Sequence, residues 1–216
     1  MSKGHAHEHQ HGHGQPHRHP PQPDIEDQGY DPYQVMAEAV GELLIEKKVF
    51  TAEELRRTIE MIDSRDASFG GRVIARAWTD PAFKARLMKD VNAAAAELGI
   101  DAGPIPIRAV ENTPQAHNVI VCTLCSCYPR LLIGLPPDWY KSRAYRSRVV
   151  HEPRAVLKEF GTMLPDDVEV RVYDSTAELR YIVLPMRPKG SDKLDEASLA
   201  RLVTRDSMIG VAVIDR

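Results

Sequence analysis

Apolar residues recur at helical spacing through the first half of the chain, and this pattern predicts four helices, at residues 31–48, 51–62, 71–79 and 81–98. Asp31, which precedes a proline, is typical of a helix start. Thr51 and Glu54 have the spacing of a capping box at the start of the second helix. Gly70 and Gly71 are predicted to form a joint between helices. These helices look too exposed and extended to form a bundle alone, so we expect them to pack on a partner chain.

After Gly103 and Pro104 the pattern changes to short apolar or alternating runs. These runs predict strands at 105–110, 118–122, 168–173, 179–184 and 209–214. Helical patterns lie between and after them, at 138–150, 153–160 and 195–203. The chain is therefore predicted to be α+β, with helices before the strands and among them.

Charge and hydropathy exclude several classes of function. The chain has 28 Lys+Arg against 31 Asp+Glu, which gives no electrostatic reason to expect nucleic acid or an anionic membrane as a partner. The mean hydropathy is −0.36, and no apolar run approaches the length of about 18 residues that a membrane span needs. Three cysteines make no disulfide scaffold, which favours a cytoplasmic location.

Residues 1–23 have a composition of their own. Seven of the nine histidines lie in the first 19 residues, and four prolines follow in the second half of the segment. Such a segment has too little apolar surface to offset the entropy of ordering, so we expect a disordered tail and no secretory signal peptide. Closely spaced imidazoles bind Ni, Co, Cu or Zn ions loosely. The tail is thus either a metal-recruiting segment or a solvated polar one.

The three cysteines, Cys122, Cys125 and Cys127, lie directly after an apolar run. A disulfide between two of them would leave one thiol over. A tetrahedral zinc site would need a fourth ligand, for which the chain beyond the tail offers only His117 and His151. An iron–sulfur cluster normally takes four thiolates and fits less well.

Backbone amides offer another way to complete a coordination shell. The deprotonated amide nitrogens of Ser126 and Cys127, together with the three sulfurs, would give five ligands and leave a sixth position open. Loss of amide protons demands a strongly Lewis-acidic and kinetically inert ion, and trivalent cobalt or iron meets this demand better than zinc. An open position on such an ion can polarise a small bound group or a water molecule.

The segment Cys-Thr-Leu-Cys-Ser-Cys-Tyr at 122–128 resembles the metal-binding motif of the α chain of nitrile hydratases. Thr123 matches the cobalt type of this family rather than the iron type. The resemblance covers roughly residues 31–212. It includes five further segments, at 76–81, 110–113, 135–140, 145–150 and 202–210.

The resemblance implies a ligand set of three sulfurs and two backbone amides. It assigns the sulfurs to Cys122, Cys125 and Cys127, the amides to Ser126 and Cys127, and the ion to one Co³⁺ per chain, with Fe³⁺ less well matched. Cys125 is then a sulfinate and Cys127 a sulfenate, which agrees with the ready oxidation of electron-rich metal-bound thiolates. Cys127 and Ser126 are the residues expected to take part in catalysis.

Asp174, Glu178 and Arg180 resemble a family segment that holds an acid, an acid and an arginine at the same spacing. The resemblance implies that they surround and tune the metal ligands. Without it, the same residues would be interpreted as a turn between two strands with a surface ion pair, which is typically worth little.

The family also implies an architecture and partners. A helical arm, residues 24–103, would pack on the partner subunit, and residues 104–216 would form a layered α/β/β/α catalytic domain. The partner is a β subunit that supplies arginines to the oxidised cysteines and part of the pocket, in an α2β2 assembly. A cobalt-loading activator protein is a further expected partner.

The implied reaction is the hydration of a small nitrile to an amide, with either the nitrile or hydroxide bound to the metal. Arg130 departs from the aromatic residue that many cobalt-type members carry after the motif. A basic residue there also resembles the γ subunit of thiocyanate hydrolase, which converts thiocyanate to carbonyl sulfide and ammonia. A third interpretation is a non-catalytic cobalt-binding or maturation protein.

Overall fold

The computed structural model describes residues 31–214, so the predicted His-rich tail lies outside the described residues. The chain divides into two compact units, residues 1–55 and 56–216. The sequence instead predicts a boundary at 103–104. Helices between 67 and 97 share the second unit with the strands, because their apolar faces, including Val73 and Ile74, are buried in its core.

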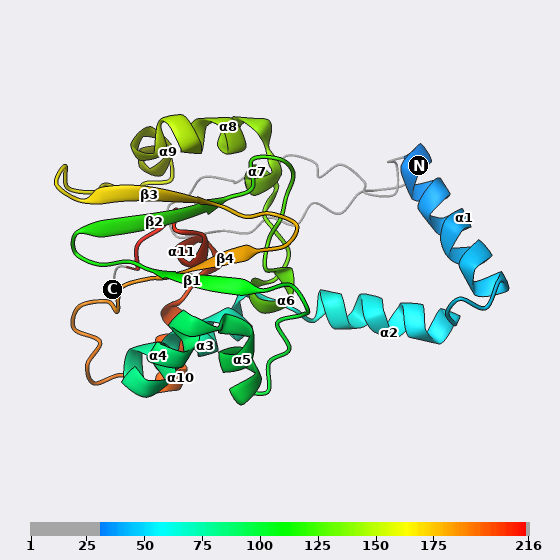
Figure 1. The fold of residues 1–216 in the computed structure, drawn as a ribbon, viewed down its shortest axis with the longest axis horizontal. Helices are drawn as coiled ribbons and strands as arrows, with labels where there is room; N and C mark the ends of the chain where they lie inside the picture. Colours follow the sequence, from blue (N-terminus) through cyan, green and yellow to red (C-terminus); the bar gives the residue numbers. More distant parts are fainter. Residues whose placement is uncertain (1–30, 215–216) are drawn as a thin grey trace, which may run out of the picture. The chain divides into compact units, whose positions relative to one another are not determined.

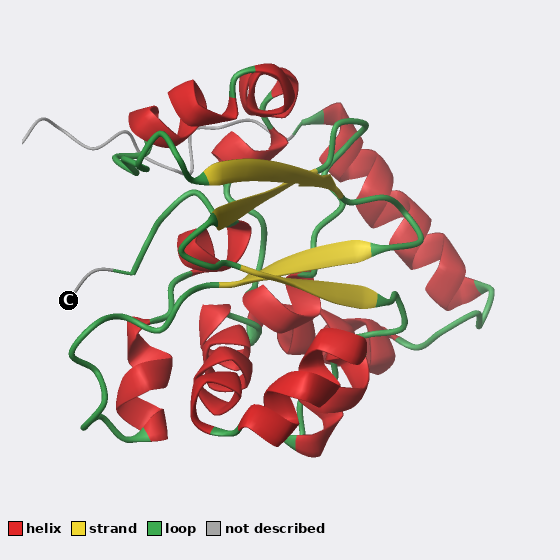
Figure 2. Ribbon diagram, turned by 60° about the vertical axis from the view of Figure 1, so that its left-hand side comes forward, coloured by secondary structure: helices red, strands yellow, loops and turns green. Residues whose placement is uncertain are grey.

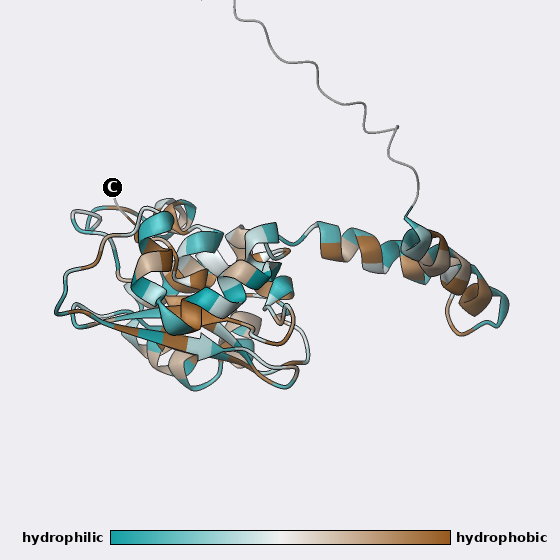
Figure 3. Cartoon of the chain, turned by 90° about the horizontal axis from the view of Figure 1, so that it is seen from above, coloured by the Kyte–Doolittle hydropathy of each residue, from teal (hydrophilic) through white to brown (hydrophobic). Residues whose placement is uncertain are grey.

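Helix α1 (Pro32–Glu46) begins where the sequence predicts. The Asp31 carboxylate accepts the Tyr33 N–H at 2.8 Å, and the Gln34 side chain accepts the Asp31 N–H at 3.1 Å. None of the α1 residues is buried, and hydrophobic residues lie along the helix (Figure 3).

Helix α2 (Ala52–Asp63) has the predicted capping box. Thr51 Oγ1 accepts the Glu54 N–H at 3.1 Å, and the Glu54 carboxylate accepts the Thr51 N–H at 2.7 Å. These paired bonds satisfy backbone donors that the first turn of a helix cannot pair internally.

Three helices follow: α3 (Ala67–Thr79), α4 (Pro81–Lys89) and α5 (Val91–Glu97). The joint predicted at Gly70 and Gly71 is wrong, because both glycines lie inside α3. A Cβ on Gly71 would meet the backbone oxygen of Ala200 at 2.7 Å, so glycine permits close helix packing there. The single helix predicted over 81–98 is divided at Asp90, whose side chain caps α5.

Four strands form two parallel pairs. β1 (Ile107–Glu111) pairs with β4 (Arg180–Leu184), and β2 (Ala116–Val121) pairs with β3 (Glu169–Asp174). All six residues of β2 are buried, including the polar His117 and Asn118, and its apolar residues Val119–Val121 lie in the core. These strands agree with the four predicted between 105 and 184.

Helices cover both outer faces of the paired strands (Figures 1 and 2). Helices α3, α4, α5 and α10 (Glu196–Leu202) lie beside β1 and β4, while α8 (Arg143–His151) and α9 (Pro153–Glu159) lie beside β2 and β3. The predicted α/β/β/α layering is confirmed. Two single-turn helices, α6 (Arg130–Ile133) and α7 (Asp138–Lys141), follow β2. No helix among residues 31–214 is long and apolar enough to cross a bilayer.

The strand predicted at 209–214 is wrong. Thr204 and Ser207 form a capping box that begins the short helix α11 (Arg205–Ile209), and Gly210 ends it in a left-handed conformation. The apolar run there is explained by burial, because Ile209 and Val211 are both inaccessible to solvent. Helix α11 packs against β2 and β4.

A buried histidine ties α11 to β2. His117 Nε2 donates to the Gly210 carbonyl oxygen at 2.7 Å, and His117 Nδ1 lies 3.2 Å from Asn112 Nδ2, which donates to it. Asn112 Oδ1 is already an acceptor for Asn118, so the amide is fixed in this orientation. Burial lowers the pKa of His117 from 6.5, and the bond to Gly210 opposes this only in part.

We expect the chain to lose stability as the pH falls from 7 to 5. The unfolded chain binds a proton at His117 near its ordinary pKa of 6.5, whereas the buried imidazole stays neutral to lower pH. The stability that the neutral His117 contributes is therefore fully present above pH 6.5 and declines below it. Urea unfolding across this range should show a shallower decline for His117→Gln, which keeps a donor near Nε2 but cannot titrate. Equal slopes for both proteins would contradict the assignment.

Candidate metal centre

The cysteine loop, residues 122–127, joins the buried end of β2 to helix α6. Its thiols are free and differ in exposure: Cys122 is buried, Cys125 is exposed and Cys127 is half-buried. Within the described residues, these three side chains form the only group of three or more potential ligands that converges as a metal site would.

The three sulfurs fit a single bound ion. The Cys125 sulfur lies 3.5 Å from that of Cys122 and 3.4 Å from that of Cys127, and all three lie within 4.8 Å of one another. Two thiolates at about 2.3 Å from one ion would be about 3.3 Å apart at a right angle and about 3.8 Å apart in a tetrahedron. The two separations from the Cys125 sulfur fall in that interval, so these donors need little rearrangement to share a metal.

The pKa values of two of the thiols are shifted in opposite directions. Hydrogen bonds from the Cys127 and Cys122 side chains and from the Ser126 amide lower the pKa of Cys125. Burial, together with the hydrogen bond to Cys125, raises the pKa of Cys127 to about 12. The Cys125 thiol is therefore deprotonated more readily than the Cys127 thiol.

Polar contacts from three elements hold the loop. The Asp174 carboxylate, at the end of β3, accepts the Thr123 N–H at 2.9 Å and the Thr123 hydroxyl at 2.5 Å. Arg146 of α8 donates to the Thr123 carbonyl oxygen at 3.2 Å. The buried Tyr140 hydroxyl of α7 donates to the Cys127 carbonyl oxygen at 3.0 Å.

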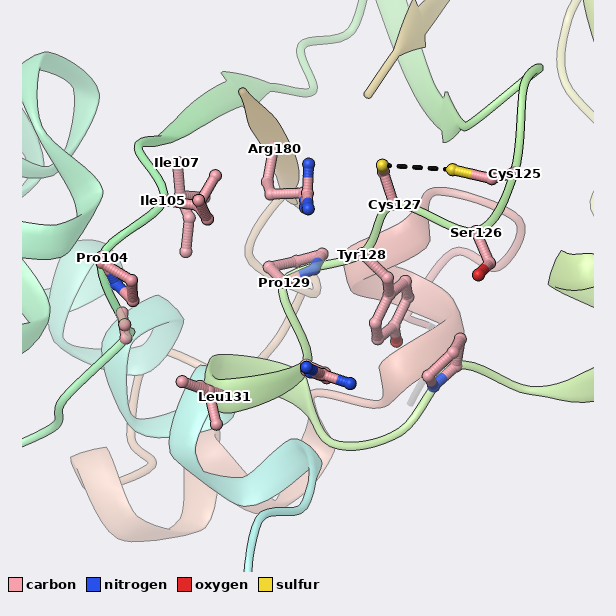
Figure 4. A pocket seen from close by; sticks show the side chains of 14 residues that line it. Pro104, Ile105, Ile107, Cys125, Ser126, Cys127, Tyr128, Pro129, Leu131 and Arg180 are labelled. Carbon is pink, nitrogen blue, oxygen red and sulfur yellow. Dashed lines mark hydrogen bonds between the residues drawn. The ribbon is translucent and has the colours of Figure 1, made fainter. Parts of the chain in front are cut away.

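One side of the loop opens onto a pocket of about 420 Å³ (Figure 4). Its lining includes Cys125, Ser126 and Cys127, with Arg130 and Arg180. The sulfurs of Cys125 and Cys127 point toward each other, and Arg180 reaches in from the start of β4 (Figure 4). The remaining wall is largely apolar and comes from residues 102–105, 107, 128–129, 131 and 136.

Not all of the other predicted residues lie at the loop or the pocket. Asp174 contacts the loop and Arg180 lines the pocket, and Arg180 Nη1 is buried without a hydrogen-bond partner among the described residues. Glu178 lies exposed in the turn before β4, outside the pocket lining. His117 is engaged with Gly210, which agrees with its not being needed as a ligand.

Sequence reasoning missed Arg146 and Tyr140. Both lie beyond the cysteine loop in the chain, and they reach it only because the fold brings α7 and α8 back to the loop. The spacing of the cysteines in the sequence gives no indication of either residue. Tyr140 could have been suspected as a buried aromatic residue whose hydroxyl needs a partner.

Comparison with known proteins now decides the family. The model of the family "Nitrile hydratase, alpha chain" matches residues 31–212. The chain belongs to the nitrile hydratase α-chain family. This family consists of enzyme subunits that work with a partner subunit, as the sequence predicts.

Relatives in this family include proteins with two different named activities. The chain is 48% identical, over 85% of its length and 92% of the relative's, to the α subunit of the high-molecular-weight cobalt-containing nitrile hydratase of Rhodococcus rhodochrous. It is 40% identical to the γ subunit of thiocyanate hydrolase of Thiobacillus thioparus, over 89% of this chain and 84% of that one. A solved structure of an Fe-type nitrile hydratase from Comamonas testosteroni Ni1, a double mutant, superposes with a TM-score of 0.78 at 40% identity, over 86% and 93% of the two chains.

Proposed function

We propose that this chain is the α subunit of a cobalt nitrile hydratase, which adds water to a nitrile and yields an amide. The observation that carries the proposal is the convergence of three sulfurs at the edge of a pocket, in a chain 48% identical to a cobalt-containing α subunit. Thr123 in the loop supports cobalt over iron, although an Fe-type structure is also similar.

The ligands would be the sulfurs of Cys122, Cys125 and Cys127 and the amide nitrogens of Ser126 and Cys127. Trivalent cobalt held there would supply Lewis acidity toward a small molecule in the pocket. Oxidation adds two oxygen atoms to the Cys125 sulfur and one to the Cys127 sulfur, and the added oxygens accept charge-assisted hydrogen bonds. Arginines of a β subunit are the proposed donors.

Residues of the cysteine loop and of its surroundings have different proposed roles in the reaction. The Cys127 sulfenate would take a proton from the attacking water, or its oxygen would attack the nitrile carbon, with the S–O bond then breaking as the oxygen of a water molecule replaces it on sulfur. Ser126 would donate a hydrogen bond nearby. The carbon gains the oxygen of one water molecule, and the nitrogen gains both of its protons. Asp174 and Arg180 orient the loop and the pocket wall, and Glu178 is proposed to support them from the adjacent turn.

The deciding experiment is co-expression with a β chain, followed by metal analysis, intact mass and turnover of acrylonitrile. The proposal expects one cobalt per chain, three added oxygen atoms and amide formation. Zinc in place of cobalt, with unmodified cysteines, would overturn it. A chain that binds cobalt but turns over neither acrylonitrile nor thiocyanate would instead favour a non-catalytic cobalt-binding protein.

A second candidate is thiocyanate hydrolysis. Arg130 and Arg180 both line the pocket, and two guanidinium groups favour an anion such as thiocyanate over a neutral nitrile. The 40% identity to a thiocyanate hydrolase γ subunit supports the same idea. Parallel assays with acrylonitrile and thiocyanate separate the candidates, and Arg130→Leu should lower thiocyanate turnover far more than nitrile turnover if the second is correct.

We propose that helix α1 packs on the partner in an α2β2 assembly. None of its residues is buried, and Tyr33, Met36 and Val40 are at least half exposed, as a helix made for a partner surface requires. Met36→Asp should reduce the β chain recovered with a tagged α chain several-fold. Glu38→Ala, on the same helix, should leave recovery unchanged. Equal recovery for both variants would reject this interface.

The tail, residues 1–23, is proposed to recruit cobalt through its seven histidines. Deleting residues 1–23 should leave turnover per bound cobalt unchanged, because the ligands all lie in the cysteine loop. At limiting cobalt, the deletion should lower the cobalt content per chain. A full-length variant with the tail histidines replaced by glutamine controls for length. Equal cobalt content in all three proteins would reject recruitment.

A further inference from the structure

Thr123 is the most heavily bound residue of the exposed part of the cysteine loop. Its N–H and hydroxyl are both donated to the Asp174 carboxylate, at 2.9 and 2.5 Å, and its carbonyl oxygen accepts from Arg146 Nη1 at 3.2 Å. All of its polar groups are therefore paired. It lies between the ligands Cys122 and Cys125, so its backbone sets where the second sulfur falls relative to the first.

The two partners of Thr123 come from rigid elements on different sides of the loop. Asp174 is the last residue of β3 and stands opposite Val121 in the parallel register, directly before the loop begins. Arg146 lies in α8, and the buried side chains of Tyr145 and Val149 fix this helix against the core. The loop itself is exposed from residue 123 to residue 126. Packing therefore does not fix this stretch, and hydrogen bonds must.

We propose that Arg146 is a positioning residue for the metal centre, which holds the Thr123 carbonyl and shapes the loop before the metal enters. One atom of its side chain supports a dedicated role: Arg146 Nε is buried with no hydrogen-bond partner among the described residues. A surface arginine without a task would keep Nε hydrated, since leaving a charged donor buried and unpaired is costly.

The physical consequence is preorganisation. A loop that is flexible in the metal-free chain must become ordered when the ion binds. The conformational entropy lost in this ordering weakens the binding of the ion. With Thr123 held at both its N–H and its C=O, the sulfurs of Cys122 and Cys125 already lie 3.5 Å apart. Removing a hydrogen bond from a charged donor is expected to weaken metal retention about tenfold.

The test compares Arg146→Met with Arg143→Met in the full chain, co-expressed with its partner in limiting cobalt. Both residues lie on α8 and line the same surface depression beside Leu124, but among the described residues no hydrogen bond joins the Arg143 guanidinium to the loop. The measurements are cobalt per chain, amide hydrogen exchange of residues 123–126 in the metal-free chain, and thermal unfolding.

The proposal expects Arg146→Met to hold about tenfold less cobalt at limiting supply, to regain it in excess cobalt, and to exchange loop amides faster. Its unfolding temperature should match that of Arg143→Met, and Arg146→Lys should recover part of the loading. Cobalt content equal to that of Arg143→Met, or a loss that follows a lower unfolding temperature, would overturn it. The inference rests on the proposed function only in that the loop binds a metal. A wild-type chain that loads cobalt but hydrates no nitrile would refute the function and leave this test intact.

Discussion

Cys127→Ser is expected to abolish cobalt retention and lower turnover by at least about a thousandfold, because a serine hydroxyl is a poor ligand for an ion held by thiolates. The Cys127 sulfur lies 3.4 Å from that of Cys125 and completes the convergent set. The variant also loses the sulfur on which the proposed sulfenate forms, so activity would be lost even if an ion were retained. Elemental analysis and turnover of the complex with its partner measure both effects.

Folding is the necessary control for this substitution. Cys127 is only half-buried, so serine should leave the thermal unfolding of the metal-free chain nearly unchanged. Cys122→Ser should also lose the metal, but it places a hydroxyl where only 1% of the side chain is exposed and should lower the unfolding temperature as well. A Cys127→Ser variant with full cobalt content and activity would contradict the proposed centre.

The part of the site that sequence could predict is the part made by neighbours in the chain. Three cysteines within one short loop are close in space whatever the rest of the fold does, and the apolar run before them indicates the buried strand that leads into the loop. The capping residues Asp31 and Thr51 are local in the same sense, since each bonds a backbone group within three residues. Such features are decided by the covalent chain and a few hydrogen bonds.

The residues that sequence could not predict act across distance. Arg146 reaches the loop from 23 residues away, and Asp174 does so from 51 residues away, at a position fixed by strand register. The error at Gly70 has a similar origin: a Cβ there would meet Met208 Sδ at 2.5 Å, so the glycine serves packing rather than a joint. Only the resemblance to a family singled out Asp174, and nothing in the sequence singled out Arg146.

A second distant contact lies behind the loop, where α11 ends against β2. Gly210 has a φ of +92°, and a Cβ at this position would lie 2.0 Å from the Asn118 backbone oxygen. The carbonyl oxygen of the same glycine accepts the buried His117 Nε2–H at 2.7 Å. Relief of such a clash requires α11 and β2 to move apart, and β2 is the strand that leads directly into Cys122.

Gly210→Ala is therefore expected to lower the free energy of unfolding by about 2–5 kcal/mol, the sum of a left-handed backbone penalty of about 1–2 kcal/mol and a clash in the core of about 1–3 kcal/mol. The matched control is Gly99→Ala, which has a φ of +71° but no atom within 4 Å of the added Cβ. The control should show the backbone penalty alone, in urea unfolding of the metal-free chain. Because the displaced strand leads into the cysteine loop, Gly210→Ala should also lose cobalt at temperatures where it remains folded, whereas Gly99→Ala should not. Equal destabilisation by the two substitutions would show that β2 and α11 can separate without cost, and the coupling between this contact and the metal centre would then be wrong.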